Sequence, residues 1–317
     1  MHSRLGTELI LSPSVFSIRL PRRLRAALVL VFLFLGSSRF SFADPVRVTD
    51  ATGHAVALAQ PAQRIVSLAP SITEILYALG LDAEIAGVTD ACDYPPAARS
   101  KPRVGGINSA SVEAVVARRP DLILALDALN GPALVDALRR LGLPVASLAS
   151  DSVAAIQREI GMIGALAGRA AAARALNDSI RARLEAVEAR VASAAPVTVV
   201  YVLWHEPLMT IGRSSFIADL IHRAGGRLAD EHSPLPYYRL ALEAVLEQNP
   251  AVILIPTEIG PTAVALQRQY WERWPQLAAV RTGRIYSVDS DLIHRPGPRI
   301  AAGVELLAQR LHPELFP

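Results

Sequence analysis

The chain has 317 residues, of which 51% are hydrophobic and 19% charged, with a single cysteine, so disordered, collagen-like and disulfide-scaffold proteins are excluded. The net charge of +3 arises in the first 43 residues, which carry six arginines and one acid, and the other 26 basic and 28 acidic residues give a formal −2. Beyond residue 43 the chain therefore has no basic excess that would attract nucleic acid or an anionic membrane.

The N-terminal residues have the pattern of a secretory signal. Four arginines precede an apolar run at 26–35, namely Arg19, Arg22, Arg23 and Arg25, and small and polar residues follow the run as far as Ala43. This run is too short to cross a bilayer, which takes about 20 residues. We therefore predict a signal peptide at 1–43, cleaved after Ala43, and a soluble periplasmic protein.

Residues 44–150 are predicted to form a first α/β lobe. Short apolar stretches between 46 and 61 indicate a hairpin or edge strand, and a strand at 64–69 leads into a helix that begins with the capping-box pattern Ser71-x-x-Glu74. The remaining predicted elements are strands at 84–88, 121–126 and 145–148 and helices at 111–118 and 132–141. Strands that alternate with helices favour a mostly parallel sheet covered on both faces.

Residues 151–194 contain no proline, are rich in alanine, and repeat apolar residues at three- and four-residue steps. The pattern predicts one long amphipathic helix that connects two lobes. The alternative is a pair of helices broken near Gly161, Gly164 or Gly168.

Residues 195–317 repeat the alternation, with strands at 197–203, 251–255 and 284–288 and helices at 215–223, 240–247, 263–271 and 299–311. Val112-Glu-Ala-Val-x4-Pro120-x2-Ile-Leu and Leu242-Glu-Ala-Val-x4-Pro250-x2-Ile-Leu match 130 residues apart. The predicted fold is therefore α/β, with two similar lobes that have mostly parallel sheets, joined by one long helix, and a ligand cleft between them.

The sequence offers little support for catalysis. It contains no phosphate-binding loop, zincin, nucleophile-elbow or dinucleotide motif, and Cys92 has no second cysteine for a disulfide or a multi-cysteine metal site. A metal-dependent enzyme that uses His205, His232 and His294 is the competing class, although their spacing matches no ligand pattern. We therefore predict a non-enzymatic protein without a metal site.

Aromatic residues are scarce, and several fall in predicted loops that would converge at a cleft: Tyr94, Trp204, Tyr237 and Tyr238. Aromatic rings give a large contact area at low entropic cost and suit a planar ligand. Four polar residues near the C-terminus are placed to bond the rim of such a ligand: Asp291, His294, Arg295 and Arg299.

Several motifs resemble the periplasmic binding proteins of ABC importers for cobalamin, haem and iron-siderophores. They are the segment from Arg64 to Gly80, Cys92-Asp-Tyr-Pro95, Val104-Gly-Gly106, the repeated Glu-Ala-Val units, and the segment from Asp291 to Arg299. The resemblance runs from about residue 46 to the C-terminus. It implies the same two-lobed fold and capture of a ligand for a membrane permease.

Asp93-Tyr94-Pro95 and the pattern that ends at Arg299 look most like the cobalamin-binding branch. The resemblance implies a corrinoid as transported ligand rather than a resident cofactor, with these ligand-binding residues: Tyr94, Trp204, His205, Tyr237, Tyr238, His294 and Arg295. Leu126 and Val104 stand where the best-known member has tryptophans, and His294 replaces an acid. Haem is the alternative ligand, with iron bound by Tyr94 together with His205 or His294, and an iron-siderophore is the third.

Glu113 and Glu243 hold equivalent places in the repeated unit. The resemblance implies that these carboxylates dock onto arginines of the permease, one per lobe, and that the protein acts as a monomer. The alternative is an ordinary structural role, because acids in the first turn of a helix stabilise it through the helix dipole.

Overall fold

The computed structural model describes residues 45–316, so the predicted signal peptide lies outside the described residues. Four parallel strands form the first sheet, in the order β4-β3-β7-β8: β3 (Ile65–Ser67), β4 (Ile85–Val88), β7 (Leu122–Leu126) and β8 (Val145–Leu148). The predicted hairpin is present as β1 (Val46–Thr49) and β2 (Ala55–Leu58). The helices of this lobe are α2 (Pro70–Ala78), α3 (Val112–Ala117) and α4 (Asp127–Arg140), and a second short strand pair is β5 (Gly105–Gly106) and β6 (Ser109–Ala110).

The second sheet repeats the first. Its parallel strands have the order β12-β9-β14-β15: β9 (Val197–Tyr201), β12 (Gly226–Leu228), β14 (Val252–Pro256) and β15 (Ile285–Val288). In both sheets the order in space is second, first, third, fourth strand. The helices here are α7 (Phe216–Arg223), α8 (Leu242–Gln248), α9 (Pro261–Glu272), α10 (Ala278–Arg281), α11 (Ser290–Ile293) and α12 (Ile300–Leu311).

The repeated sequence units occupy equivalent places in the two sheets. The first unit forms α3 and leads into β7, and the second forms α8 and leads into β14, so each supplies the third strand of its sheet. The prediction of two similar α/β lobes with mostly parallel sheets is confirmed.

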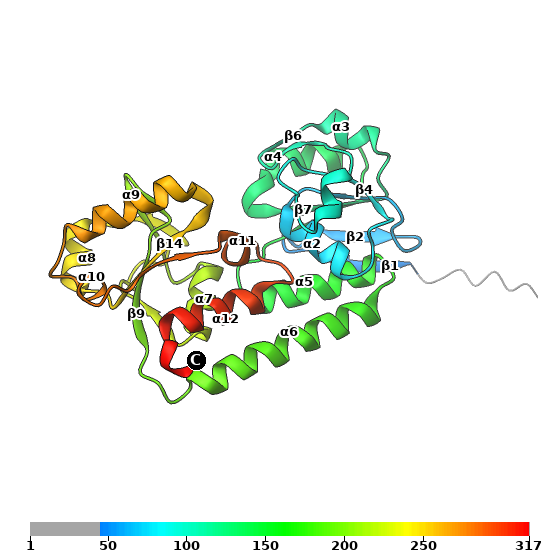
Figure 1. Ribbon diagram of the computed structural model, residues 1–317. Helices are drawn as coiled ribbons and strands as arrows, with labels where there is room; N and C mark the ends of the chain where they lie inside the picture. The colour runs from blue at the N-terminus through cyan, green and yellow to red at the C-terminus, as the bar shows by residue number, and fades with distance from the viewer. Residues whose placement is uncertain (1–44, 317) are drawn as a thin grey trace, which may run out of the picture. The chain divides into compact units, whose positions relative to one another are not determined.

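The prediction of one continuous helix over 151–194 was wrong. The segment forms α5 (Val153–Leu166) and α6 (Ala170–Val191), which run side by side and exchange hydrogen bonds between Gln157 and Asn177 (Figure 1). Gly168 has φ +69°, a conformation that ends a helix and favours glycine. The long helix that leads into the second lobe is therefore α6 alone, at 22 residues or about 33 Å.

A continuous apolar core connects the sheets through these helices. Ile65 and Leu124 of the first sheet, Leu184 and Val187 of α6, and Val199 of the second sheet belong to one cluster of buried side chains. Within residues 45–316, none of the helices combines the length and apolar character that crossing a bilayer requires.

Two local predictions were also wrong. Helix α2 starts at Pro70 after Ala69, no side chain caps its first turn, and Glu74 forms ion pairs with arginines instead of a capping box with Ser71. The regions around Trp204 and Tyr237, predicted as loops, form an antiparallel sheet of β10 (Trp204–His205), β11 (Leu208–Ile211) and β13 (Tyr237–Arg239). These strands have two to four residues, too few for a pattern of alternation to emerge.

The break between α5 and α6 predicts opposite effects of alanine substitution at Gly168 and at Gly161. A Cβ at Gly168 would approach Pro61 at 3.1 Å on top of the strained φ, whereas a Cβ at Gly161, inside α5, meets nothing within 4 Å. We expect Gly168→Ala to lower the free energy of unfolding by about 1–2 kcal/mol and Gly161→Ala to raise it by about 0.5–1 kcal/mol. Urea unfolding followed by circular dichroism measures both, and shifts of the same sign would contradict the assigned break.

Candidate functional site

A cavity of about 270 Å³ lies between residues of the two lobes. The first lobe contributes residues at the carboxyl ends of β7 and β8, which is where parallel sheets present their ligand sites. The lining residues are Leu126, Ala128, Leu129, Ala149, Ser150, Asp151, Ser214, Ser215, Phe216, Pro236, Tyr237, His294 and Pro296. Of the predicted ligand-binding residues, the structure brings Tyr237 and His294 together in this wall.

The register of the small antiparallel sheet separates the other aromatic residues. Trp204 pairs with Met209, and Tyr237 pairs with Ile211, so Trp204 and Tyr237 project from the same face of the sheet. Both rings are exposed, at 48% and 43%. Tyr237 lines the cavity, whereas Trp204 is not among the lining residues: its indole N–H donates to the Glu206 carbonyl at 2.9 Å, and its ring centre lies 5.8 Å from that of His205.

His205 and Tyr238 project from the opposite face of the same sheet. The Tyr238 hydroxyl donates to Asp230 at 2.9 Å, and burial together with this carboxylate raises the pKa of Tyr238. His205 lies 3.4 Å, through Nδ1, from the amide nitrogen of the buried Gln267 of α9. The structure thus places these two predicted ligand-binding residues away from the face that carries Tyr237.

His294 is held at both ring nitrogens. Its Nε2 lies 2.6 Å from the Tyr201 hydroxyl, and its Nδ1 lies 2.8 Å from a Glu258 carboxylate oxygen. Burial raises the pKa of Tyr201 well above its usual value. Both ring nitrogens of His294 are thus engaged by side chains of the protein, and neither is free to bind a metal without breaking one of these contacts.

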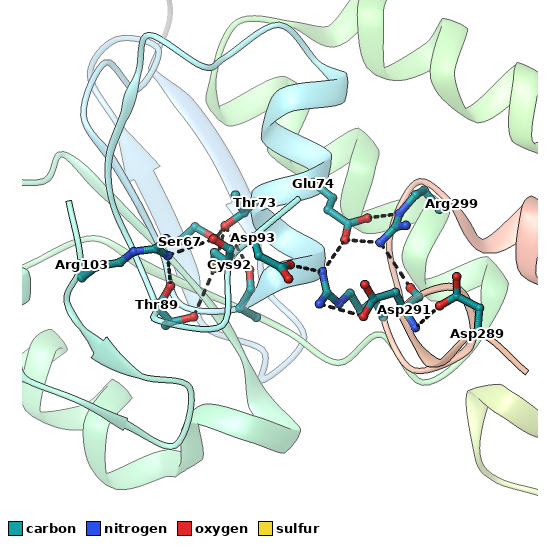
Figure 2. A network of polar contacts seen from close by, with 12 residues as sticks. Ser67, Thr73, Glu74, Thr89, Cys92, Asp93, Arg103, Asp289, Asp291 and Arg299 are labelled. Carbon is teal, nitrogen blue, oxygen red and sulfur yellow. Dashed lines mark hydrogen bonds and ion pairs between the residues drawn. The ribbon is translucent and has the colours of Figure 1, made fainter. Parts of the chain in front are cut away.

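Tyr94 lies against a polar cluster that the two arginines of the C-terminal segment form with carboxylates; Figure 2 shows Glu74, Asp93, Asp291 and Arg299 of this cluster. Arg295 contacts carboxylates of Asp93 and Asp291, each at 2.8 Å, and the guanidinium carbon of Arg299 lies 4.0 Å from the centre of the Tyr94 ring. Tyr94 remains 44% exposed. Neither Tyr94 nor Arg295 is among the residues that line the cavity.

Two departures from the family pattern have different positions. Leu126, 4% exposed, is part of the cavity wall, whereas Val104 is buried in the apolar core of the first lobe beside Gly87. The lone Cys92 is also buried, within hydrogen-bond distance of the Thr73 and Thr89 hydroxyls.

Asn130 shapes the first-lobe wall and escaped the sequence analysis. Its side chain accepts a hydrogen bond from the Leu126 N–H at 2.7 Å and donates to the carbonyls of Leu68 and Ile107, each at 2.9 Å. These bonds hold the turn that carries Leu129 into the cavity. The only local signal is the turn dipeptide Gly131-Pro132 that follows, where Gly131 has φ +67°.

Glu113 and Glu243 are both exposed, each in the first turn of the helix that precedes the third strand of its sheet. Hydrogen bonds from its own backbone N–H and from Ser111 lower the pKa of Glu113, so this carboxylate is charged at neutral pH. Among residues 45–316, no three His, Cys, Asp or Glu side chains are grouped to hold a metal ion.

Comparison with known proteins identifies the class. Residues 65–292 match the model of the family described as periplasmic binding protein, and the chain belongs to that family. Two curated relatives are an uncharacterised ABC transporter substrate-binding lipoprotein, YvrC, of Bacillus subtilis (31% identity, 86% of this chain and 87% of the relative) and the vitamin B12-binding protein of Vibrio cholerae (30% identity, 77% and 87%).

Solved structures agree with the sequence relatives. The periplasmic vitamin B12 binding protein BtuF of Vibrio cholerae superposes with a TM-score of 0.72 at 28% identity, over 79% of this chain and 97% of its own. The periplasmic haem-binding protein BhuT in complex with two haems gives 0.72 at 26% identity, over 81% and 100%. The chain is therefore a substrate-binding protein of an ABC transporter and not an enzyme, and its family acts outside the cytoplasm.

The His294–Glu258 contact makes a prediction about acid stability. The hydrogen bond from His294 lowers the pKa of Glu258 from its usual 4.5, against the opposing effect of partial burial. A lowered carboxyl pKa stabilises the fold above the unfolded-state pKa, and this contribution is lost as the pH falls through the folded-state value.

As the pH is lowered from about 6 to about 3.5, we therefore expect the free energy of unfolding to fall less in Glu258→Gln than in the unaltered protein. The difference should be less than about 1 kcal/mol, because the Glu258 side chain is half exposed. Urea unfolding at several pH values measures the difference. Glu247→Gln, on an exposed position of α8, is the control and should follow the unaltered protein. Parallel profiles for all three proteins would contradict the assigned contact.

Proposed function

We propose that the protein captures cobalamin, or a related corrinoid, between its lobes and delivers it to an ABC importer. The observation that carries this proposal is the exposed Tyr237 in the wall of an interlobe cavity, with a second exposed aromatic residue, Trp204, on the same small sheet. Flat, open aromatic surfaces suit a large planar macrocycle. The vitamin B12-binding proteins among the relatives support the same ligand.

The histidines favour a corrinoid over haem. Cobalamin brings its own axial base, so it needs no protein group on its metal, whereas haem iron is usually bound by a protein side chain. His294 would have to break a hydrogen bond to ligate a metal, and His205 projects from the face opposite Tyr237. The exposed Tyr94 keeps haem as the second candidate, supported by the similarity to BhuT.

The test is a titration of residues 44–317 with cyanocobalamin and, under the same conditions, with haemin, followed by visible absorbance and tryptophan quenching. We expect saturable 1:1 binding of cyanocobalamin by a monomer, with a Kd in the micromolar range or tighter, and no comparable binding of haemin. Tyr237→Ala should weaken binding about tenfold or more because it removes a stacking surface.

Leu141→Ala is the matched control, since Leu141 is 59% exposed and precedes the amino end of β8, opposite the cavity. It should bind as the unaltered protein does. A shifted haemin Soret band without cyanocobalamin binding would reassign the ligand to haem, and no response to either compound would indicate a siderophore.

We further propose that Glu113 and Glu243 dock onto arginines of the permease. Their support is their exposure and their equivalent places in the two lobes, which give the carrier one charged contact per lobe. Exposed charges at an interface act mainly through steering and register, so they can be removed without unfolding the carrier.

The double variant Glu113→Ala with Glu243→Ala should abolish corrinoid uptake by cells while the Kd for cyanocobalamin stays unchanged. The control variant Glu185→Ala with Glu247→Ala removes two other exposed acids and should leave uptake intact. Loss of ligand affinity in the first variant, or equal uptake by both, would refute the docking role.

A further inference from the structure

A buried carboxylate of α2, in the first lobe, forms ion pairs with two arginines of the segment that precedes α12 in the second lobe. The Glu74 side chain is 1% exposed and accepts a forked pair of hydrogen bonds from Arg299, each at 2.7 Å (Figure 2). Arg295 adds a third contact to it at 3.2 Å. Close by, Gly297 lies against the backbone of Ser71, where a Cβ would stand only 3.2 Å from the Ser71 carbonyl oxygen.

The same two arginines hold two consecutive residues of a first-lobe loop. Arg295 bonds the carboxylate of Asp93, and Arg299 covers the ring of Tyr94, the next residue. A planar guanidinium over an aromatic face is an attractive arrangement. One face of Tyr94 is thereby occupied by Arg299, while the residue remains 44% exposed.

The two arginines depend on Glu74 to different degrees. Without the Glu74 charge, Arg295 keeps its carboxylate contacts with Asp93 and Asp291. Of the hydrogen bonds made by the Arg299 side chain within the described residues, only the one to the Asp291 carbonyl, at 3.4 Å, would remain. The position of Arg299 under the Tyr94 ring thus depends on the charge of Glu74.

We propose that Glu74 is a positioning residue for ligand binding: through Arg299 it holds the Tyr94 ring in place, although it does not itself reach the ligand. The inference rests on the proposed function together with the family resemblance, which implies that Tyr94 is a ligand-binding residue. A consequence is that the position of Tyr94 in the first lobe depends on arginines of the second lobe. The parts of the site that the two lobes contribute are therefore coupled.

A double-mutant cycle tests this assignment. Glu74→Gln keeps the size of the side chain and removes its charge. We expect it to weaken cyanocobalamin binding about tenfold when Tyr94 is present and less than about twofold in the Tyr94→Ala background. Equal losses in the two backgrounds, or no loss with Tyr94 present, would overturn the proposal. If Glu74→Gln does not fold, Arg299→Lys replaces it in the same cycle, because lysine cannot make the forked contact.

A purely structural effect is excluded with Asp50→Asn. Asp50 is also buried in the first lobe and pairs with Arg139 at 2.6 Å, on elements that do not carry the cluster. This control should lower the unfolding temperature but leave the Kd unchanged, and a loss of affinity equal to that of Glu74→Gln would overturn the positioning role.

Hydrogen exchange of the unliganded proteins separates this inference from the proposed function. In Glu74→Gln, amides of residues 89–99 should exchange faster relative to those of β3 and β7, and in Asp50→Asn they should not. If the unaltered protein binds no cyanocobalamin, the proposed ligand is wrong, and this exchange comparison still tests whether Glu74 holds the loop that carries Tyr94. Unchanged exchange of residues 89–99 in Glu74→Gln would overturn the positioning role.

Discussion

The Glu74 carboxylate is removed from water inside the contact between α2 and the segment that precedes α12. A buried charge requires compensating partners, and removing one side of such a pair costs about 3–5 kcal/mol. The apolar core that runs from the first sheet through α6 to the second sheet supplies cohesion, but hydrophobic burial has no direction. The forked Arg299 contact has one geometry, so it fixes where the segment with His294 lies against the first lobe.

Much of the fold follows from the sequence because both sheets are buried and parallel. Such strands are continuous apolar runs, as in Leu122–Leu126 and Val252–Pro256, and the repeated unit before each of them predicts equivalent lobes. The break at Gly168 did not follow, since Gly161 and Gly164 stand in the same alanine-rich segment and stay helical. Only the contact of Gly168 with Pro61 and its positive φ distinguish it, and both are tertiary facts.

The site was predictable as a set of residue types but not as a surface. Trp204 and His205 are neighbours in sequence, as are Tyr237 and Tyr238, and only the register of β10, β11 and β13 assigns one of each pair to each face. A shift by one residue would reverse the assignment. Arg295 and Arg299 were predicted at the rim of the ligand, whereas their carboxylate partners Glu74 and Asp93 lie more than 200 positions earlier, beyond the reach of any local pattern.

The side chains on the small antiparallel sheet and in the cavity wall also bear on how a ligand is recognised. The face with Trp204 and Tyr237 offers aromatic area, while the nitrogens of His294 in the cavity wall are occupied by Tyr201 and Glu258. A wall of this kind binds by contact area and shape rather than by coordination of a metal. If the ligand is the proposed macrocycle, area alone discriminates poorly among flat rings, and selectivity would depend on how the two walls are held. The ion pairs of Glu74 join α2 of the first lobe to the segment that carries His294, so a residue outside the cavity would contribute to which ligand fits.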